Sequence, residues 1–202
     1  MARRLGIFGG SFDPIHRGHL AALDAVRKAR PLERVFLVPA GRPPHKRSGS
    51  RAPFEDRLAM VRLALAGRSG VELLDWEGRR EGPSYSIDTV EELMRREPGA
   101  GVDLLVGADM LADLPSWHRA AELAGLVTVV AFSRPGTALE PAQAAFRAAF
   151  SGREAVVVPA PLLDISATEI RRRLGAGEGV EGLLPPGVES YARSKGLYGA
   201  GG

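Results

Sequence analysis

Short apolar runs alternate with helix-like segments along the 202-residue sequence, and this alternation limits the possible folds more than any other feature. A short apolar run bounded by turn residues is typical of a buried strand. A segment with apolar residues three or four positions apart is typical of a helix that buries one face. Strands that alternate with helices pair in parallel, so the pattern predicts an α/β fold: a Rossmann-like, doubly wound parallel sheet in a single domain with C-terminal helices.

The pattern predicts six strands. They are residues 5–8, 34–38, 71–74, 103–107, 126–132 and 155–158, and the fifth is expected to be the longest. Helices are predicted at residues 19–29, 54–66, 86–96, 141–151, 166–174 and 188–195, and a broken helical region follows residue 107. The length fits one domain over residues 1–202, with a frayed tail at residues 199–202.

The composition excludes several classes of function. Cysteine is absent, which excludes disulfides, thiol nucleophiles and thiolate metal sites. No stretch approaches the roughly 18 apolar residues of a membrane-spanning helix. The apolar run near the N-terminus is too short for the core of a signal peptide. We therefore expect no membrane association and a cytoplasmic location.

The charges are distributed unevenly. Residues 1–51 contain eleven Lys and Arg against three Asp and Glu, a net charge of +8, whereas the rest of the chain carries −5. This asymmetry indicates an anionic partner: a nucleic acid, a membrane or a small phosphate compound. Few aromatic residues are interleaved with the basic ones, which disfavours nucleic acid. We expect Arg27, Lys28, Arg30 and Arg34 to be solvated.

The turn after the first strand has the features of a phosphate site. Gly9 and Gly10 let the backbone turn sharply and approach a ligand. His19 lies where a helix begins, and the free N–H groups of a helix N-terminus favour phosphate. His16 is three residues earlier, so both imidazoles are expected to face the same space. A metal site of Asp13, His16 and His19 is an alternative, but no further ligand cluster accompanies it.

Two more strand ends carry candidate binding groups. A Pro/Gly-rich loop after strand 34–38 carries the basic residues Arg42, His45, Lys46 and Arg47, and we expect it to close on anionic oxygens. Gly107 and Asp109 follow strand 103–107, where an acid commonly holds a ribose hydroxyl. Trp117, next to His118, is suited either to the core or to stacking on a flat heterocycle.

A second helix N-terminus lies near the end of the sequence. Ser166 and Glu169 have the spacing of a capping box, which starts a helix. Thr168 and Arg171 add a hydroxyl and a guanidinium group to that N-terminus. Two such termini and a basic loop indicate a polyphosphate ligand. Neither G-x-x-x-x-G-K-[ST] nor G-x-G-x-x-G is present.

In this order the motifs resemble the nucleotidyltransferase superfamily with HxGH and ISxTxxR signatures, here residues 16–19 and 165–171. Within it the sequence resembles the bacterial nicotinate mononucleotide adenylyltransferases. The matching segments are residues 9–20, 43–46, 83–89, 107–109, 116–119, 133–136 and 184–188. Two small departures are Ala167, where a second serine is common, and Ser86, where threonine is common.

The resemblance implies transfer of the ATP adenylyl group to nicotinate mononucleotide in NAD biosynthesis, by one nucleotidyltransferase domain. The implied cofactor is Mg²⁺ carried by the ATP phosphates, with no metal site on the protein. The implied catalytic residues are His16, His19, Lys46 and Arg171. The implied ATP-binding residues are Gly9, Gly10, Ser11, Phe12, Gly107, Asp109, Arg134, Ile165, Ser166 and Thr168. The implied residues for the mononucleotide are His45, Tyr85, Ser86, Trp117 and His118.

Three alternatives stay open at this point. The acceptor of the adenylyl group could be nicotinamide mononucleotide, which differs from the acid only in an amide. It could also be phosphopantetheine, although enzymes for that acceptor look shorter and lack the Pro-Ser-Tyr and Trp-His elements. A nucleotide-sensing module on the same fold is the alternative outside enzymes. The sequence leaves open whether the protein is a monomer or a homo-oligomer.

Overall fold

A single parallel sheet forms the centre of the computed structural model, which describes residues 3–43, 50–132, 139–160, 163 and 165–199. Among these residues, six strands are ordered β3-β2-β1-β4-β5-β6. They are β1 (Arg4–Gly10), β2 (Arg34–Pro39), β3 (Val71–Leu73), β4 (Gly101–Gly107), β5 (Thr128–Phe132) and β6 (Val156–Val158). This is the strand order of a doubly wound Rossmann-like sheet, so the predicted fold class is confirmed.

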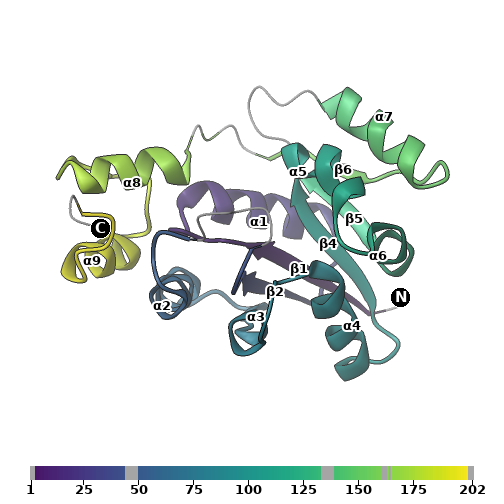
Figure 1. The fold of residues 1–202 in the computed structure, drawn as a ribbon, viewed down its shortest axis with the longest axis horizontal. Helices are drawn as coiled ribbons and strands as arrows, with labels where there is room; N and C mark the ends of the chain where they lie inside the picture. The colour runs from purple at the N-terminus through teal and green to yellow at the C-terminus, as the bar shows by residue number, and fades with distance from the viewer. Residues whose placement is uncertain (1–2, 44–49, 133–138, 161–162, 164, 200–202) are drawn as a thin grey trace.

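Helices cover both faces of the sheet. They are α1 (Arg17–Ala29), α2 (Phe54–Leu65), α3 (Trp76–Arg79), α4 (Ser86–Arg96), α5 (Ala108–Asp113), the 3-10 helix η1 (Leu114–Ser116), α6 (Ala120–Leu126), α7 (Leu139–Ala149), α8 (Ala167–Gly175) and α9 (Pro186–Ser194). Figure 1 shows α8 and α9 together at one end of the molecule, on the left, and α4, α6 and α7 towards the other. No helix in the described ranges is long and apolar enough to cross a membrane.

Alternate residues of each strand pack on opposite faces of the sheet. In β2, Val35 and Leu37 belong to one apolar core, which includes residues of α1 and α2, whereas Phe36 and Val38 belong to the other, which includes residues of α4 to α7. A fully buried aliphatic or aromatic side chain contributes about 1.5–3 kcal/mol. The two apolar cores therefore hold the sheet between its helical layers.

The largest difference from the predicted elements is at the fifth strand. The apolar run 126–132 was expected to be one strand and the longest, but β5 begins at Thr128 and is shorter than β1 and β4. Leu126 ends α6 instead, and it is one of the exposed large apolar residues. The sequence pattern also missed α3, which has only four residues. Both errors arise where an element is too short for its periodicity to be read.

The connections after β1 and β4 leave the sheet on opposite faces. Leu20 and Leu23 of α1, which follows β1, belong to one apolar core. Leu111 of α5, which follows β4, belongs to the other. Because the two strands are neighbours, their carboxyl ends form the switch point where ligands bind in this architecture.

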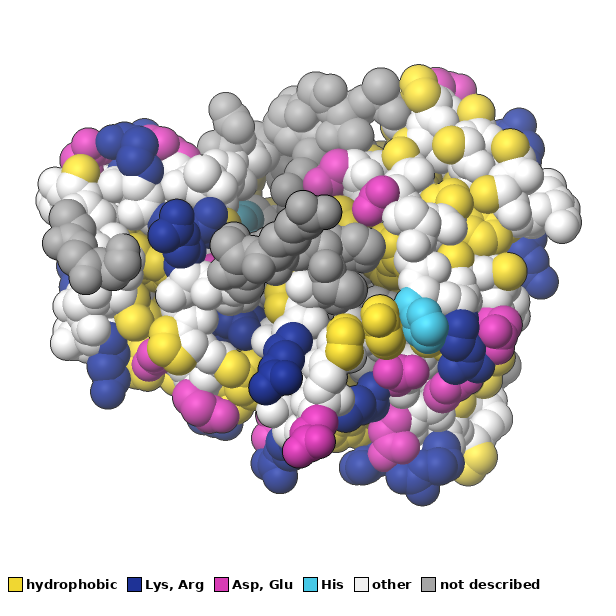
Figure 2. Space-filling view, viewed as in Figure 1, with side chains coloured by type: hydrophobic (Ala, Val, Ile, Leu, Met, Phe, Trp, Pro, Cys, Tyr) yellow, Lys and Arg dark blue, Asp and Glu magenta, His cyan; other side chains and the backbone are white. Residues whose placement is uncertain are grey.

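Several basic residues of the N-terminal segment have acidic partners from the rest of the chain. Arg30 Nε donates to Asp103 at 2.8 Å, and Arg34 Nη2 donates to Glu97 at 2.6 Å. The expectation that Arg30 and Arg34 are simply solvated was therefore wrong. Figure 2 shows basic and acidic side chains next to one another around much of the face in view. The +8 of the first 51 residues is thus partly neutralised within the fold.

Candidate active site

A cavity of about 390 Å³ opens at the carboxyl ends of β1 and β4. Small-molecule sites typically occupy about 300–1,000 Å³. The predicted site residues that line it are Gly9, Gly10, Ser11, Phe12, His19, Tyr85, Ser86, Gly107, Asp109, Trp117, His118 and Arg171. The fold therefore brings groups from the turn after β1, the segments after β3 and β4, and α8 into one space.

Some predicted site residues do not line this cavity. His16, Ile165, Ser166 and Thr168 are described and do not contribute to its lining. His45, Lys46 and Arg134 lie outside the described residues, so their roles stay predictions.

The last two residues of β1 are glycines, and the structure gives a different reason for glycine at each position. A methyl group at Gly10 would lie 3.1 Å from the ring of Phe12, which is buried and has a left-handed φ of +45°. The Phe12 ring therefore favours glycine at position 10. A methyl group at Gly9 would meet no atom of the described residues within 4 Å. Packing among these residues does not require glycine there, and a glycine at this point also lets a ligand approach the backbone closely.

The histidines of the HxGH signature form a stack. The rings of His16 and His19 are 3.6 Å apart between centroids, and the His19 ring also packs against Phe12 at 5.2 Å. His16 is buried, with 3% of its surface exposed, and only His19 of the two lines the cavity. A methyl group at Gly18 would lie 3.0 Å from His16 Nδ1. Glycine in the signature thus makes room for the buried ring.

The hydrogen bonding of His19 determines which of its nitrogens can donate. The backbone N–H of His16 donates to the ring nitrogen Nδ1 of His19 at 3.2 Å. The backbone N–H of His19 donates to the His16 carbonyl at 3.0 Å. A ring nitrogen that accepts a hydrogen bond carries no proton. In neutral His19 the proton is therefore on Nε2, the nitrogen that can donate to a phosphate oxygen.

The turn from Ser11 to Asp13 is fixed by hydrogen bonds from residues 51–57, which the sequence analysis did not predict. The buried Arg57 donates to the Ser11 carbonyl at 2.7 Å, and the Asp13 carboxylate accepts the N–H groups of Arg51 at 2.7 Å and Ala52 at 3.1 Å. Burial lowers the pKa of Arg57, and the charge of Asp13 opposes this effect. No sequence motif marks these contacts, because they join segments about 40 positions apart.

The described residues contain no group of three or more His, Asp or Glu side chains placed to hold a metal ion. The Asp13 carboxylate is instead used in binding backbone N–H groups. The alternative of a metal site at Asp13, His16 and His19 therefore has no support in the geometry.

The N-terminus of α8 approaches the turn after β1. Arg171 Nη1 donates to the Asp13 carbonyl at 2.7 Å, and its Nη2 donates to Thr168 Oγ1 at 3.0 Å. Thr168 therefore orients Arg171 from outside the cavity lining. Ser166 Oγ accepts the N–H of Glu169 at 3.1 Å, so the predicted cap is present.

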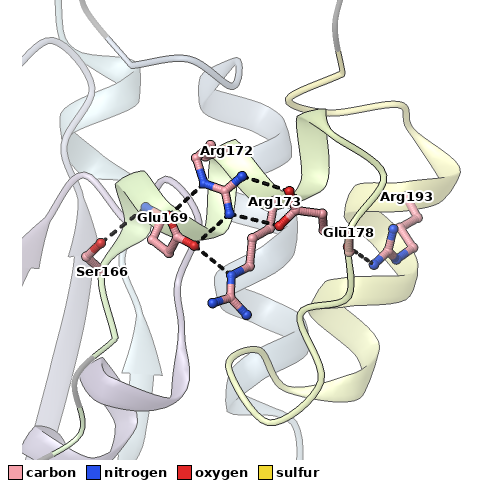
Figure 3. Close-up of polar contacts among 6 residues, drawn as sticks. All are labelled: Ser166, Glu169, Arg172, Arg173, Glu178 and Arg193. Carbon is pink, nitrogen blue, oxygen red and sulfur yellow. Dashed lines mark hydrogen bonds and ion pairs between the residues drawn. The ribbon is translucent and has the colours of Figure 1, made fainter.

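The second half of the predicted capping box is not formed. Figure 3 shows the Glu169 carboxylate directed to Arg172 and Arg173 on its own helix. These hydrogen bonds lower the pKa of Glu169 to about 2. Arg172 also binds the Glu178 carboxylate, and Arg193 of α9 donates to the Glu178 carbonyl. The polar groups of this region thus link α8 to α9.

The stacked rings of Tyr85 and His118 form an aromatic platform that also lines the cavity. The rings of Tyr85 and His118 are stacked, with centroids 4.1 Å apart and planes 27° apart. Trp117 also lines the cavity and packs against the second apolar core, and its stacking on a heterocycle stays a prediction. Stacked rings of this kind can extend onto a flat heterocycle.

A buried acid beside this platform was also missed. Glu77 lines the cavity, is 8% exposed and accepts the Thr89 hydroxyl at 2.8 Å. Burial raises the pKa of Glu77, while hydrogen bonds from Thr89 and Ser84 lower it. Ser84 Oγ also accepts the N–H groups of Gly41 and Arg42, each at 3.0 Å. The only feature of the sequence that could have indicated this group is the position of Ser84, a partner of Glu77, next to Tyr85.

The fold and this cavity define a Rossmann-like α/β protein with its ligand site at the switch point of the sheet. The model of the cytidylyltransferase-like family matches residues 7–173. The probable nicotinate-nucleotide adenylyltransferase of Gloeobacter violaceus is 47% identical over 202 residues, covering 98% of this chain and 97% of that protein. The enzyme of the same name from Thermomicrobium roseum is 40% identical, covering 96% and 91%.

The chain therefore belongs to the cytidylyltransferase-like family and, within it, to the nicotinate-nucleotide adenylyltransferases. The fold is shared with a solved nicotinic acid mononucleotide adenylyltransferase of Plasmodium falciparum complexed with NaAD. That structure has a TM-score of 0.82 at 20% identity and covers 97% of each chain.

Proposed function

We propose that this protein transfers the adenylyl group of ATP to nicotinate mononucleotide, giving nicotinate adenine dinucleotide and pyrophosphate for NAD biosynthesis. Its family membership supports the reaction. The observation that carries the proposal is the composition of one cavity. His19 and Arg171 line one part of it, and the stacked rings of Tyr85 and His118 line another. A dinucleotide with phosphates between two flat bases needs this combination.

The reaction needs positioning and charge stabilisation more than acid–base chemistry. A phosphate oxygen of the mononucleotide attacks the α-phosphorus of ATP, one P–O bond forms, and the bond to the β-phosphate oxygen breaks to release pyrophosphate. The attacking phosphate is largely ionised at pH 7, because the second pKa of a phosphomonoester is about 6. The protein must hold the two reactants in line and stabilise charge on the transferring group.

The groups that bind the phosphates have the following roles in this proposal. His19 donates from Nε2 to the phosphates, and Arg171 binds the β- and γ-phosphates and then the leaving pyrophosphate. The buried His16 holds the His19 ring through the stack, so we assign it a positioning role. Gly9, Gly10, Ser11 and Phe12 form the backbone surface for the triphosphate. Lys46, His45, Arg134, Ile165, Ser166 and Thr168 keep the roles that the family resemblance implies.

The adenosine and pyridine groups occupy the rest of the cavity. Gly107 and Asp109 line the cavity where β4 passes into α5, and in this proposal they hold the adenosine. Tyr85, Ser86, Trp117 and His118 frame the pyridine ring.

Mg²⁺ is proposed to arrive with ATP. Among the described residues, the acids that line the cavity are Asp13, Glu77 and Asp109, and the Asp13 carboxylate already accepts two backbone N–H groups. This donor set fits a cation held mainly by triphosphate oxygens, because Mg²⁺ is usually bound by one or two carboxylates together with substrate phosphates. When bound, Mg²⁺ would neutralise charge on the phosphates.

The test is pyrophosphate release with ATP, Mg²⁺ and one acceptor at a time: nicotinate mononucleotide, nicotinamide mononucleotide or phosphopantetheine. The proposal expects the highest kcat/KM with nicotinate mononucleotide. A higher kcat/KM with another acceptor would replace the substrate. ATP binding without release from any acceptor would favour a nucleotide-sensing module.

A further inference from the structure

Tyr198, which follows α9, reaches back to the turn after β1. Its hydroxyl donates to Asp13 Oδ1 at 2.8 Å, although the two residues are 185 positions apart. Its φ is +67°, in the left-handed region that bulky residues rarely adopt. A strained residue of this kind persists only where the surrounding structure holds it, and such residues cluster at functional sites.

The end of α9 is built to direct the chain toward this contact. The Leu197 N–H donates to the Ala192 carbonyl at 2.9 Å, and the Gly196 N–H donates to the Arg193 carbonyl at 3.0 Å. With Gly196 at a φ of +60°, these two bonds form a Schellman motif, which ends a helix and reverses the chain. Tyr198 is therefore delivered to Asp13 by a defined turn.

Helix α8 is shaped to accept the Tyr198 backbone. A methyl group at Gly175 would lie 2.7 Å from the Tyr198 carbonyl oxygen, which is too close for any other residue without a shift. The same helix carries Arg171, whose guanidinium group donates to the Asp13 carbonyl. Asp13 is thus bound through its carboxylate by Tyr198 and through its carbonyl by a residue of α8.

The surroundings keep Tyr198 in its donating form. Burial raises the pKa of Tyr198, and the charge of Asp13 raises it further. The hydroxyl therefore stays protonated at any pH at which the enzyme would work.

We propose that Tyr198 is a positioning residue for adenylyl transfer. By holding Asp13, it fixes the turn that leads to His19 relative to Arg171 on α8. Tyr198 lies outside the cavity lining, whereas Asp13 belongs to it, so Tyr198 acts through Asp13. This inference rests on the proposed function for the reaction that it concerns.

Tyr191 provides a matched control. Its hydroxyl donates to Asp56 Oδ1, also at 2.8 Å, and it belongs to α9, but Asp56 is on α2 and does not line the cavity. Tyr198→Phe and Tyr191→Phe each remove one hydroxyl and one hydrogen bond to a carboxylate. A loss of stability would appear as a lower melting temperature, whereas a positioning contribution would appear as a lower kcat in the folded Tyr198→Phe variant.

The experiment measures kcat, both KM values and the melting temperature of the wild type and the two variants. We expect kcat of Tyr198→Phe to fall between about tenfold and a hundredfold, because small misplacements of reacting groups have effects of that size. The KM for the mononucleotide should stay within twofold in both variants, and kcat of Tyr191→Phe should stay within twofold of the wild type. A kcat of Tyr198→Phe within twofold of the wild type, or an equal loss in both variants, would overturn the inference.

Gly175→Ala gives an independent perturbation, because it displaces the Tyr198 backbone and keeps the hydroxyl. It should lower kcat as Tyr198→Phe does, and the double variant should lose less than the product of the two effects. If Tyr198→Phe does not fold, Gly175→Ala alone decides, and a wild-type kcat overturns the inference.

Failure of the proposed function would show separately, in the wild type. If the wild type prefers another acceptor, the same comparison is made with that acceptor. If it uses none, ATP affinity replaces kcat, and Tyr198→Phe must bind ATP more weakly than Tyr191→Phe.

Discussion

Gly9→Ala should separate stability from activity. Gly9 lies in β1 without a left-handed φ, and a methyl group there would meet no atom within 4 Å in the part of the chain that the structure describes. Alanine in such a position stabilises a protein by about 0.4–1 kcal/mol, chiefly by restricting the unfolded chain. In a domain of this size about 1 kcal/mol shifts the melting temperature by about 2–4 °C. We therefore expect a melting temperature equal to the wild type or up to about 4 °C higher.

The activity of Gly9→Ala should fall, because the methyl group would occupy cavity space next to the triphosphate. We expect the KM for ATP to rise at least about tenfold, equivalent to 1.4 kcal/mol of lost binding. Pyrophosphate release at varied ATP measures this, and differential scanning fluorimetry measures stability. A wild-type KM would refute the reasoning that Gly9 is glycine for the ligand. A lowered melting temperature would refute the statement that the methyl group has room.

Gly10→Ala is the control for this prediction. Its methyl group would lie 3.1 Å from the ring of Phe12, which is 2% exposed, so the ring would have to shift by a few tenths of an ångström. Overpacking of this kind costs about 1–3 kcal/mol. Gly10→Ala should therefore melt several degrees below the wild type, opposite in sign to Gly9→Ala.

Three further predictions follow from other contacts. Trp117→Ala should raise the KM for the mononucleotide far more than the KM for ATP in steady-state assays, and equal effects would mean that Trp117 is only core. Arg57→Met should lower the free energy of unfolding in urea by about 1–3 kcal/mol, because it leaves the buried carbonyls of Ala52 and Ser11 without their donor; an unchanged free energy of unfolding would contradict this. Glu169, with its pKa lowered from 4.5 to about 2 by Arg172 and Arg173, stabilises the fold above pH 4.5 and loses this effect as the pH falls toward 2. Glu169→Gln should therefore show a shallower fall of melting temperature across that interval, and an unchanged slope would count against it.

The fold could be predicted because its signal is local. Each buried strand is a short apolar run, and a helix such as α4 keeps one apolar stripe, so residues 86–96 were placed without error. The errors at β5 and α3 come from segments too short to show a period. Apolar residues at 126 and 127 continue the run of β5 in the sequence, but they end a helix in the structure.

Only part of the site could be predicted. The residues of the HxGH turn are contiguous, so their chemistry was visible, but the burial of His16 under His19 depends on tertiary packing. The contact between Asp13 and Tyr198 joins the two ends of the chain, and no spacing rule covers 185 positions. Glu77 was missed because a single acid in a sequence does not show whether it is buried.

The central claim is that the cavity at β1 and β4 performs adenylyl transfer with His19 at the phosphates. The most direct measurement compares formation of nicotinate adenine dinucleotide by the wild type and by His19→Ala, at saturating ATP, Mg²⁺ and nicotinate mononucleotide. The account predicts product from the wild type and a kcat at least about a hundredfold lower in the variant, since a donor to transition-state charge contributes about 10²–10³-fold. A folded His19→Ala variant with near-wild-type kcat, or a wild type that forms no product, would contradict it.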